Sequence, residues 1–200
     1  MIRETSYDEI FDTQRHFRTL LDSMSRPGKI NRFAAVNLSP PTGLLTASAY
    51  VAFTLLNGDA TYHLAGLPAE IGSYLSANTQ SHAVALEHAD FHFASGAGDA
   101  GFLASAKVGQ PAYPETGATV VLQVDHLGKS SSVGGLQLTL EGPGIESREI
   151  VYVAGLLPSF LDGLRARNSE FPLGVDAILT SLDGCVLCLP RTTRIRWETV

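Results

Sequence analysis

The residues best suited to bind an anion lie near the C-terminus. Arg191, Arg194 and Arg196 follow Pro190 within a few positions. A planar guanidinium binds phosphate or carboxylate through two parallel hydrogen bonds, so three arginines in one segment could hold an anionic ligand. The same residues could also form a solvated tail or a contact between subunits. The sequence leaves both interpretations of this segment open.

Asp176 stands inside an apolar strand pattern that covers residues 175–179. A carboxylate in such a strand needs an arginine or several N–H donors to be tolerated. We therefore predict that Asp176 pairs with an arginine, either Arg191 or Arg26. Arg26 immediately precedes Pro27, and proline disfavours helical backbone at the residue before it, so Arg26 should lie at a sharp helix exit.

Two segments rich in proline and glycine lead toward the same region. Residues 142–144 read Gly-Pro-Gly and follow a predicted strand. Such a turn could aim backbone N–H groups at an anion or could only redirect the chain, and redirection is the commoner role. Pro172 and Gly174 similarly fix the approach to the Asp176 strand. A ligand pocket, if the chain has one, is expected near Arg26, Asp176 and Arg191.

Two loops resemble nucleotide-binding motifs. Residues 96–101 match G-x-G-x-x-G, but Gly109 and Pro111 end the following helix after about two turns, and Asp99 would place a carboxylate where a pyrophosphate approaches. A plain glycine-rich loop is favoured, and an independent nucleotide-binding enzyme remains the alternative. Residues 128–130 read Gly-Lys-Ser but join two predicted strands, so a hairpin loop is expected there.

Cysteine and histidine give no strong metal or redox signal. Cys185 and Cys188 fit C-x-x-C, yet no second ligand pair and no helix N-terminus accompany them, so they are predicted to be small hydrophobic residues of a strand. His82, His88 and His92 lie on successive strand-like segments without an acidic ligand at regular spacing, which favours histidines on strand faces. The sequence contains no nucleophile elbow and no H-E-x-x-H motif.

The clearest predicted helix lies near the N-terminus. Ser6 and Glu9 are spaced as a capping box, and the stripe that follows predicts a core-facing side on which Phe17→Ala should cost about 3–5 kcal/mol. The stripe comprises Phe17, Leu20, Leu21 and Met24. Further helices are predicted at 44–56, which is apolar on most faces and therefore central, and at 68–77, 99–107 and 156–168.

Strand patterns alternate irregularly with these helices. They cover residues 60–65, 82–87, 91–94, 118–124, 137–141, 175–180 and 185–189. Helices lie before, among and after the strands without strict βαβ repetition, which predicts an α/β layered fold with a mixed central sheet. No repeat or linker interrupts the chain, so residues 1–200 are predicted to form a single domain.

Composition narrows the classes of partner. The 200 residues are 44% hydrophobic and 17% charged with a net charge of −6, which argues against binding to nucleic acid or an anionic membrane and suggests that partners cover some surface. Two cysteines make no disulfide framework, no secretion signal opens the chain at Met1, and no stretch reaches the ~20 apolar residues of a membrane span. A cytoplasmic protein is expected.

Several segments of the chain, taken together, form a distinctive series. Residues 17–28 read Phe-Arg-Thr-Leu-Leu-Asp-Ser-Met-Ser-Arg-Pro-Gly, and Gly-Pro-Gly-Ile, Phe-Pro-Leu-Gly-Val-Asp and Leu-Pro-Arg-Thr-Thr follow at 142–145, 171–176 and 189–193. Residues 113–119 add a weaker match. In this order, spread over nearly the whole chain, the segments resemble the PhnH family of the bacterial carbon–phosphorus lyase system.

The resemblance implies a role in phosphonate catabolism. Members of this family support formation of α-D-ribose 1-methylphosphonate 5-triphosphate from ATP and methylphosphonate, with the chemistry ascribed to a companion subunit, so the chain is expected to be inactive in isolation. The implied partners are the G, I, J and L subunits of the system, and a homodimer is implied when the chain is isolated.

The resemblance also implies a three-layer α/β/α fold similar to the large domain of PLP-dependent transferases but without the cofactor site, and no cofactor is expected. Lys29, Lys107 and Lys129 are the only lysines, all in turn-like or short-helix settings, whereas a Schiff-base enzyme needs a well-placed lysine. A PLP enzyme is therefore a third, weaker alternative. No catalytic or metal-binding residue is predicted. The ligand or interface candidates are Arg26, Gly142, Pro143, Gly144, Asp176, Arg191, Thr192 and Thr193.

Overall fold

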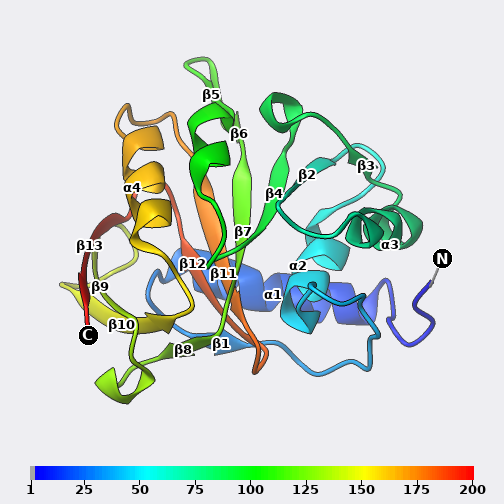
Figure 1. Ribbon diagram of the computed structural model, residues 1–200, viewed down its shortest axis with the longest axis horizontal. Coiled ribbons are helices and arrows are strands. Elements are labelled where there is room, and N and C mark those ends of the chain that lie inside the picture. The colour runs from blue at the N-terminus through cyan, green and yellow to red at the C-terminus, as the bar shows by residue number, and fades with distance from the viewer. Residues whose placement is uncertain (1–2) are drawn as a thin grey trace.

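The computed structural model describes residues 3–200 and is built around a seven-stranded sheet of mixed direction (Figure 1). The strands from β11 to β3 run parallel to one another, whereas β12 is antiparallel to both β11 and β1. From one edge to the other the strands are β1 (Asn31–Arg32), β12 (Cys185–Leu189), β11 (Asp176–Ser181), β7 (Thr119–Val124), β4 (Phe91–Ser95), β2 (Thr61–Ala65) and β3 (His82–Ala83). This confirms the predicted α/β class with a mixed sheet.

Strands β7 and β11 form the centre of the sheet because their side chains are apolar on both faces. Val120 pairs in register with Ala177, and Val121 with Ile178. Consecutive side chains point to opposite faces, so Val120 and Ala177 join one core cluster while Val121 and Ile178 join the other. A sheet covered on both faces reads as a continuous apolar run, which explains why the sequence pattern here shows little alternation.

Three helices cover one face of the central sheet: α1 (Phe11–Ser25), α2 (Thr46–Leu55) and α3 (Ala69–Thr79) (Figure 1). Helix α2 is the innermost of them, with residues 47–52 all buried and contacts to β7 and β11. Its Ser48 hydroxyl lies 2.7 Å from the Thr180 hydroxyl of β11, which satisfies both buried polar groups. The predicted central helix is thereby confirmed.

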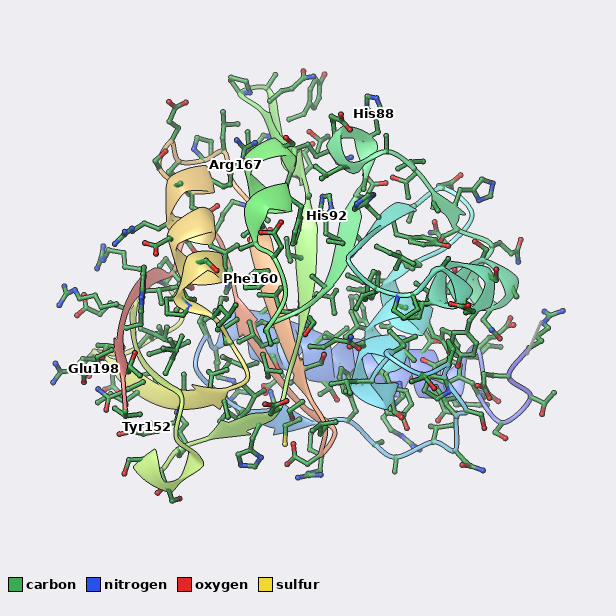
Figure 2. All side chains as sticks on the ribbon, viewed as in Figure 1. His88, His92, Tyr152, Phe160, Arg167 and Glu198 are labelled. Carbon is green, nitrogen blue, oxygen red and sulfur yellow. The ribbon has the colours of Figure 1, made fainter. Side chains whose placement is uncertain are left out.

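The opposite face is covered by helix and sheet together. Helix α4 (Pro158–Arg167) and a short 3-10 helix, η2 (Gly101–Ser105), lie above it, and Phe160 of α4 is fully buried against the central sheet (Figure 2). Beside them lies a four-stranded antiparallel sheet in the order β13 (Arg194–Thr199), β9 (Leu136–Glu141), β10 (Glu149–Ala154) and β8 (His126–Gly128). Leu138, Leu140, Val151 and Val153 of that sheet are buried in the shared core.

Four short elements complete the described chain. Strands β5 (Val108–Gln110) and β6 (Tyr113–Gly117) form a separate antiparallel pair, and the 3-10 helices η1 (Leu86–His88) and η3 (Ser131–Val133) lie in loops. Residues 82–87 were predicted as one strand, but only β3 is extended and η1 follows. Residues 99–107 were predicted as a helix, but the chain forms only η2. The predictions for 68–77 and 156–168 are confirmed as α3 and α4.

The N-terminal helix differs from its prediction in cap and in buried face. The Asp8 carboxylate, not Ser6 with Glu9, accepts the N–H groups of Ile10 and Phe11 at 2.9 and 2.7 Å. These two hydrogen bonds lower the pKa of Asp8. The buried residues of the helix are His16, Leu20 and Ser23, whereas Phe17 is 48% exposed. The prediction that Phe17 is a core residue is therefore wrong.

Within residues 3–200, no helix combines the length and apolar character needed to cross a membrane.

Candidate functional site

Asp176 and Arg191 form a clamp between the start of β11 and the loop that follows β12. The Arg191 side chain donates from Nη2 to Asp176 Oδ2 at 2.6 Å and from Nε to the same carboxylate at 3.2 and 3.3 Å. The Arg191 backbone N–H adds a 2.7 Å bond to Oδ1. Both side chains are largely buried, at 13% and 22% exposure. The pairing of Asp176 with Arg191 is thus confirmed.

The guanidinium of Arg191 has a further protein partner in the β5–β6 hairpin. Its Nη1 donates to the Pro114 carbonyl at 2.7 Å. Gly117 allows this approach, because a Cβ there would lie 2.8 Å from Nη1 and 2.4 Å from the Gly174 carbonyl. Arg191 therefore ties three chain segments together, and its main role in the structure is to fix the shape of the site.

Asn168 holds the segment before β11 from the other side. Its side-chain oxygen accepts from the Val175 N–H at 2.7 Å, and its nitrogen donates to the Val175 carbonyl at 3.1 Å. Gly174 lies between, where a Cβ would come within 2.4 Å of the Asn168 oxygen and 3.2 Å of Arg191 Cβ. The approach to β11 thus requires a glycine at position 174.

A cavity of about 450 Å³ opens beside this clamp, between α4 and the start of β13. Its apolar wall comes from Leu161, Leu164 and Ile195, and no acidic side chain among residues 3–200 lines it. The lining consists of Pro143, Leu161, Leu164, Arg165, Asn168, Phe171, Arg191, Thr192, Thr193, Arg194 and Ile195. Four of the eight residues proposed from the sequence lie here: Pro143, Arg191, Thr192 and Thr193. An apolar pocket with a few convergent cationic groups suits a ligand or side chain that combines both characters. We refer to it below as the Arg191 cavity.

The Gly-Pro-Gly turn connects this cavity to a second depression. A Cβ on Gly142 would lie 2.9 Å from the Thr192 carbonyl, and one on Gly144 would lie 2.3 Å from the Ser25 carbonyl. Both glycines have positive φ, so the turn depends on them for backbone conformation as well as for space.

Arg26 lies on the far side of that turn, away from Asp176. It forms an ion pair with Asp22 and lines a depression together with Lys29, Lys129 and Gly144. The predicted cluster is therefore divided: Asp176, Arg191, Thr192, Thr193 and Pro143 lie together, whereas Arg26 and Gly144 belong to the neighbouring depression. Arg26 is not the partner of Asp176.

Sequence reasoning missed the residues that α4 and β13 bring to the cavity. The Arg165 guanidinium lies 4.9 Å from the centre of the Trp197 ring and 2.7 Å from Asp162. Phe171 is 71% exposed at the cavity rim. Ile195 and Trp197 alternate with charged residues, and this alternation could have predicted the strand. It was overlooked because the arginines also suggested a solvated tail.

The glycine-rich loop at 96–101 does not have the geometry of a nucleotide site. It leads into the 3-10 helix η2 and not into an α-helix, so no N-terminal helix dipole faces the loop. The Asp99 carboxylate instead accepts the Gly101 N–H at 3.0 Å, and a Cβ on Gly96 would lie 2.6 Å from the Gly155 carbonyl. These glycines serve close packing. Lys129 of the 128–130 segment is paired with Glu149 at 2.5 Å.

Both cysteines are buried in β12, as predicted. Burial raises the pKa of Cys185, and the neighbouring Asp183 adds to this shift. Burial likewise raises the pKa of Cys188. A thiol held in its protonated form is a poor nucleophile and a poor metal ligand, so the two residues act as small hydrophobic side chains.

The histidines do not converge on a metal site. Within residues 3–200 no group of three or more potential ligands is assembled. His82 is exposed on β3, and His88 belongs to η1 and not to a strand, whereas His92 is fully buried in β4 beside Phe102 (Figure 2). Its two ring nitrogens have no hydrogen-bond partner among the described residues. Burial lowers the pKa of His92 to about 4, with smaller contributions from His63 and Lys107.

The fold and the cavity define a class: an α/β protein with a mixed seven-stranded sheet and a cavity lined by apolar side chains and arginines. Comparison with known proteins gives the family. Residues 5–196 match the sequence model of the bacterial phosphonate metabolism protein PhnH. The chain belongs to the PhnH family.

Two relatives agree with this membership. The chain is 34% identical over 197 residues to "Alpha-D-ribose 1-methylphosphonate 5-triphosphate synthase subunit PhnH" from Rhizobium meliloti (strain 1021), covering 96% of this chain and 94% of that protein. It is 33% identical over 182 residues to "Putative C-P lyase subunit protein HtxG" from Stutzerimonas stutzeri, covering 91% of this chain and 85% of that protein.

Proposed function

We propose that this chain is a subunit of a bacterial carbon–phosphorus lyase assembly. In that assembly it would support formation of α-D-ribose 1-methylphosphonate 5-triphosphate from ATP and methylphosphonate. The single observation that carries the proposal is the match over 96% of the chain to a relative named as a subunit of the corresponding synthase. The Arg191 cavity supports a binding role, because its lining combines apolar side chains with arginines.

We propose that chemical turnover belongs to companion subunits, with G, I, J and L as the candidates. Catalytic lysines are poorly supported here because each lysine ammonium is occupied by a carboxylate. The pairs are Lys29 with Asp22 at 2.7 Å, Lys107 with Asp90 at 2.5 Å and Lys129 with Glu149 at 2.5 Å. A Schiff base needs a lysine nitrogen free to bond an aldehyde carbon, so these contacts argue against a PLP-dependent enzyme. We propose that the fold is nevertheless related to that of PLP-dependent transferases.

We also propose that residues 1–200 form a single domain that acts in the cytoplasm, where ATP is present, and that the isolated chain forms a homodimer. The central sheet supports the first point because it joins strands from Asn31 to Leu189. The exposed apolar residues of α1, which are Phe11, Phe17 and Leu21, support the last. Light scattering coupled to size exclusion measures the oligomeric state directly.

Deletion of the gene in a host that grows on methylphosphonate tests the proposed function. We expect growth on methylphosphonate as sole phosphorus source to be lost and growth on inorganic phosphate to be unaffected. A plasmid copy of the gene should restore growth. Normal growth of the deletion strain on methylphosphonate would contradict the subunit role. The alternative, an independent nucleotide-binding enzyme that uses residues 96–101, predicts instead that the purified chain binds ATP or NAD alone.

A further inference from the structure

The edge of the four-stranded sheet presents an open strand. β13 is the last strand in the order β13-β9-β10-β8 and, with six residues, is the longest strand at the edge of any sheet in residues 3–200. It pairs with β9 from Arg194↔Glu141 to Thr199↔Leu136, and the Val200 N–H continues the ladder with a 3.0 Å bond to the Gly135 carbonyl. Hydrogen-bonded positions alternate in an antiparallel pair. The backbone groups of Ile195, Trp197 and Thr199 therefore point away from β9.

These outward groups are available to another strand. Within the described part of the chain no backbone hydrogen bond occupies them. Natural proteins commonly blunt a sheet edge with a proline, a bulge or a very short strand. β13 contains no proline, and its pairing with β9 shows no shift in register. Its charged side chains repel a strand of like charge but not one of opposite charge.

The Arg191 cavity adjoins the beginning of this edge. Arg194 and Ile195 belong both to β13 and to the cavity lining. Arg194 and Arg196 are each 75% exposed and share one carboxylate, that of Glu141, at 3.9 and 3.6 Å. The beginning of the edge therefore carries two arginines against one carboxylate in a chain whose net charge is −6, whereas Glu198 places a negative charge near its far end. Such a local field attracts acidic side chains.

We propose that β13 is a docking edge for an extended segment of a companion subunit. The segment pairs with the outward backbone groups of β13 as an added strand, places an apolar side chain in the Arg191 cavity, and directs neighbouring acidic side chains to Arg194 and Arg196. Strand addition supplies affinity through main-chain hydrogen bonds, and the cavity supplies specificity by accepting one side chain. The inference rests on the proposed subunit role and adds the surface and the chemistry of its partner.

Hydrogen–deuterium exchange with single-residue resolution tests the added strand. The full chain is measured alone and after co-expression and purification with the companion subunits. We expect exchange at the amides of Ile195, Trp197 and Thr199 to slow by about tenfold or more in the complex. The amides of Arg196 and Glu198 point toward β9 and should be slow in both samples, which provides an internal control.

The outcomes separate this inference from the subunit role. A stable complex without added protection at the outward amides would overturn the docking edge and leave the subunit role intact. Failure to form any complex would overturn both. Protection that already rises with concentration in the isolated chain would show that a second copy occupies the edge, and this would also overturn the proposal.

Two pairs of variants test the backbone and the charge separately. Thr199→Pro removes one outward N–H without breaking a bond to β9, so it should weaken the complex about tenfold or more while the chain stays folded. Thr199→Val keeps that N–H and should not weaken the complex.

Arg194→Glu tests the charge and should weaken the complex in a salt-dependent way. Arg3→Glu is the matched control, because Arg3 is also 75% exposed and lies 3.9 Å from its acidic partner. Equal affinity of Arg194→Glu and Arg3→Glu would contradict the role of charge.

Discussion

The Arg191 side chain shapes the cavity through its bonds to other groups of the protein. A sequence of arginines after a proline suggests anion binding, yet the Arg191 guanidinium is held by Asp176 and by the Pro114 carbonyl. Arg194 and Arg165 also line the cavity, and with 75% and 69% exposure they are more accessible to an external group than Arg191 is. The clamp thus positions the loop on which Thr192, Thr193 and Arg194 stand.

Replacement of Arg191 by alanine should destabilise the protein by about 2–3 kcal/mol. The loss of the side chain leaves the Asp176 carboxylate largely buried without its cation, and partial exposure of the pair makes the cost smaller than for a fully buried pair. Arg194→Ala should change the free energy of unfolding by less than about 0.5 kcal/mol because its side chain is exposed. Urea unfolding measures both. Equal stability of the two variants would contradict the clamp.

His92 should make stability depend on pH. Its folded-state pKa of about 4 lies below the ordinary value of 6.5, so the unfolded chain binds the proton first as pH falls. Stability is therefore complete above pH 6.5 and declines between pH 6.5 and 4, by about 3 kcal/mol in total from this group. Urea unfolding at pH 7 and pH 4.5 measures the change.

His92→Leu should remove this part of the pH dependence, and replacement of the exposed His82 by leucine should not. An unchanged pH profile in His92→Leu would show that other groups cause the decline.

Helix α1 buries a different side from the one that its apolar pattern predicted. Leu20 is 3% exposed and packs in the core, whereas Phe17 is on the outer side of the same helix. Leu20→Ala should cost about 2–5 kcal/mol, and Phe17→Ala less than about 1 kcal/mol. Thermal or urea unfolding distinguishes them. A larger loss for Phe17→Ala would restore the original core assignment.

Helix periodicity identifies that α1 exists but not which side it buries, because polar residues occupy the inner side. His16 lies against the sheet side with its Nε2 at 2.9 Å from the Ala34 carbonyl and its Nδ1 at 3.2 Å from the Tyr7 hydroxyl. Burial lowers the pKa of His16. Both partners lie outside α1, so the pattern within the helix cannot reveal them.

The sequence patterns predicted the central strands better than the strands of the outer sheet. Central strands such as β7 and β11 are continuous apolar runs and were found with nearly correct bounds. β10 and β13 were missed although both alternate. In the case of β13, the partner strand β9 lies more than fifty residues earlier and the arginines resemble a solvated tail. For the site, the Asp176–Arg191 pair followed from the cost of an unpaired carboxylate, while the contribution of α4 followed only from packing.

At the scale of the whole molecule, the two outer layers have different roles. The helical layer of α1, α2 and α3 closes one side of the central sheet, and the layer of α4 and the four-stranded sheet carries both the Arg191 cavity and the open edge of β13 (Figure 1). An apolar, sparsely charged chain that presents such surfaces is suited to assembly with other subunits.

The most direct test of the account measures adenine release from MgATP and methylphosphonate with purified proteins, because adenine is the part of ATP that the proposed product no longer contains. We expect release by the companion subunits together with this chain, a large loss of release when this chain is omitted, and none from this chain alone. Turnover by the chain alone, or full activity of the companion subunits without it, would contradict the account.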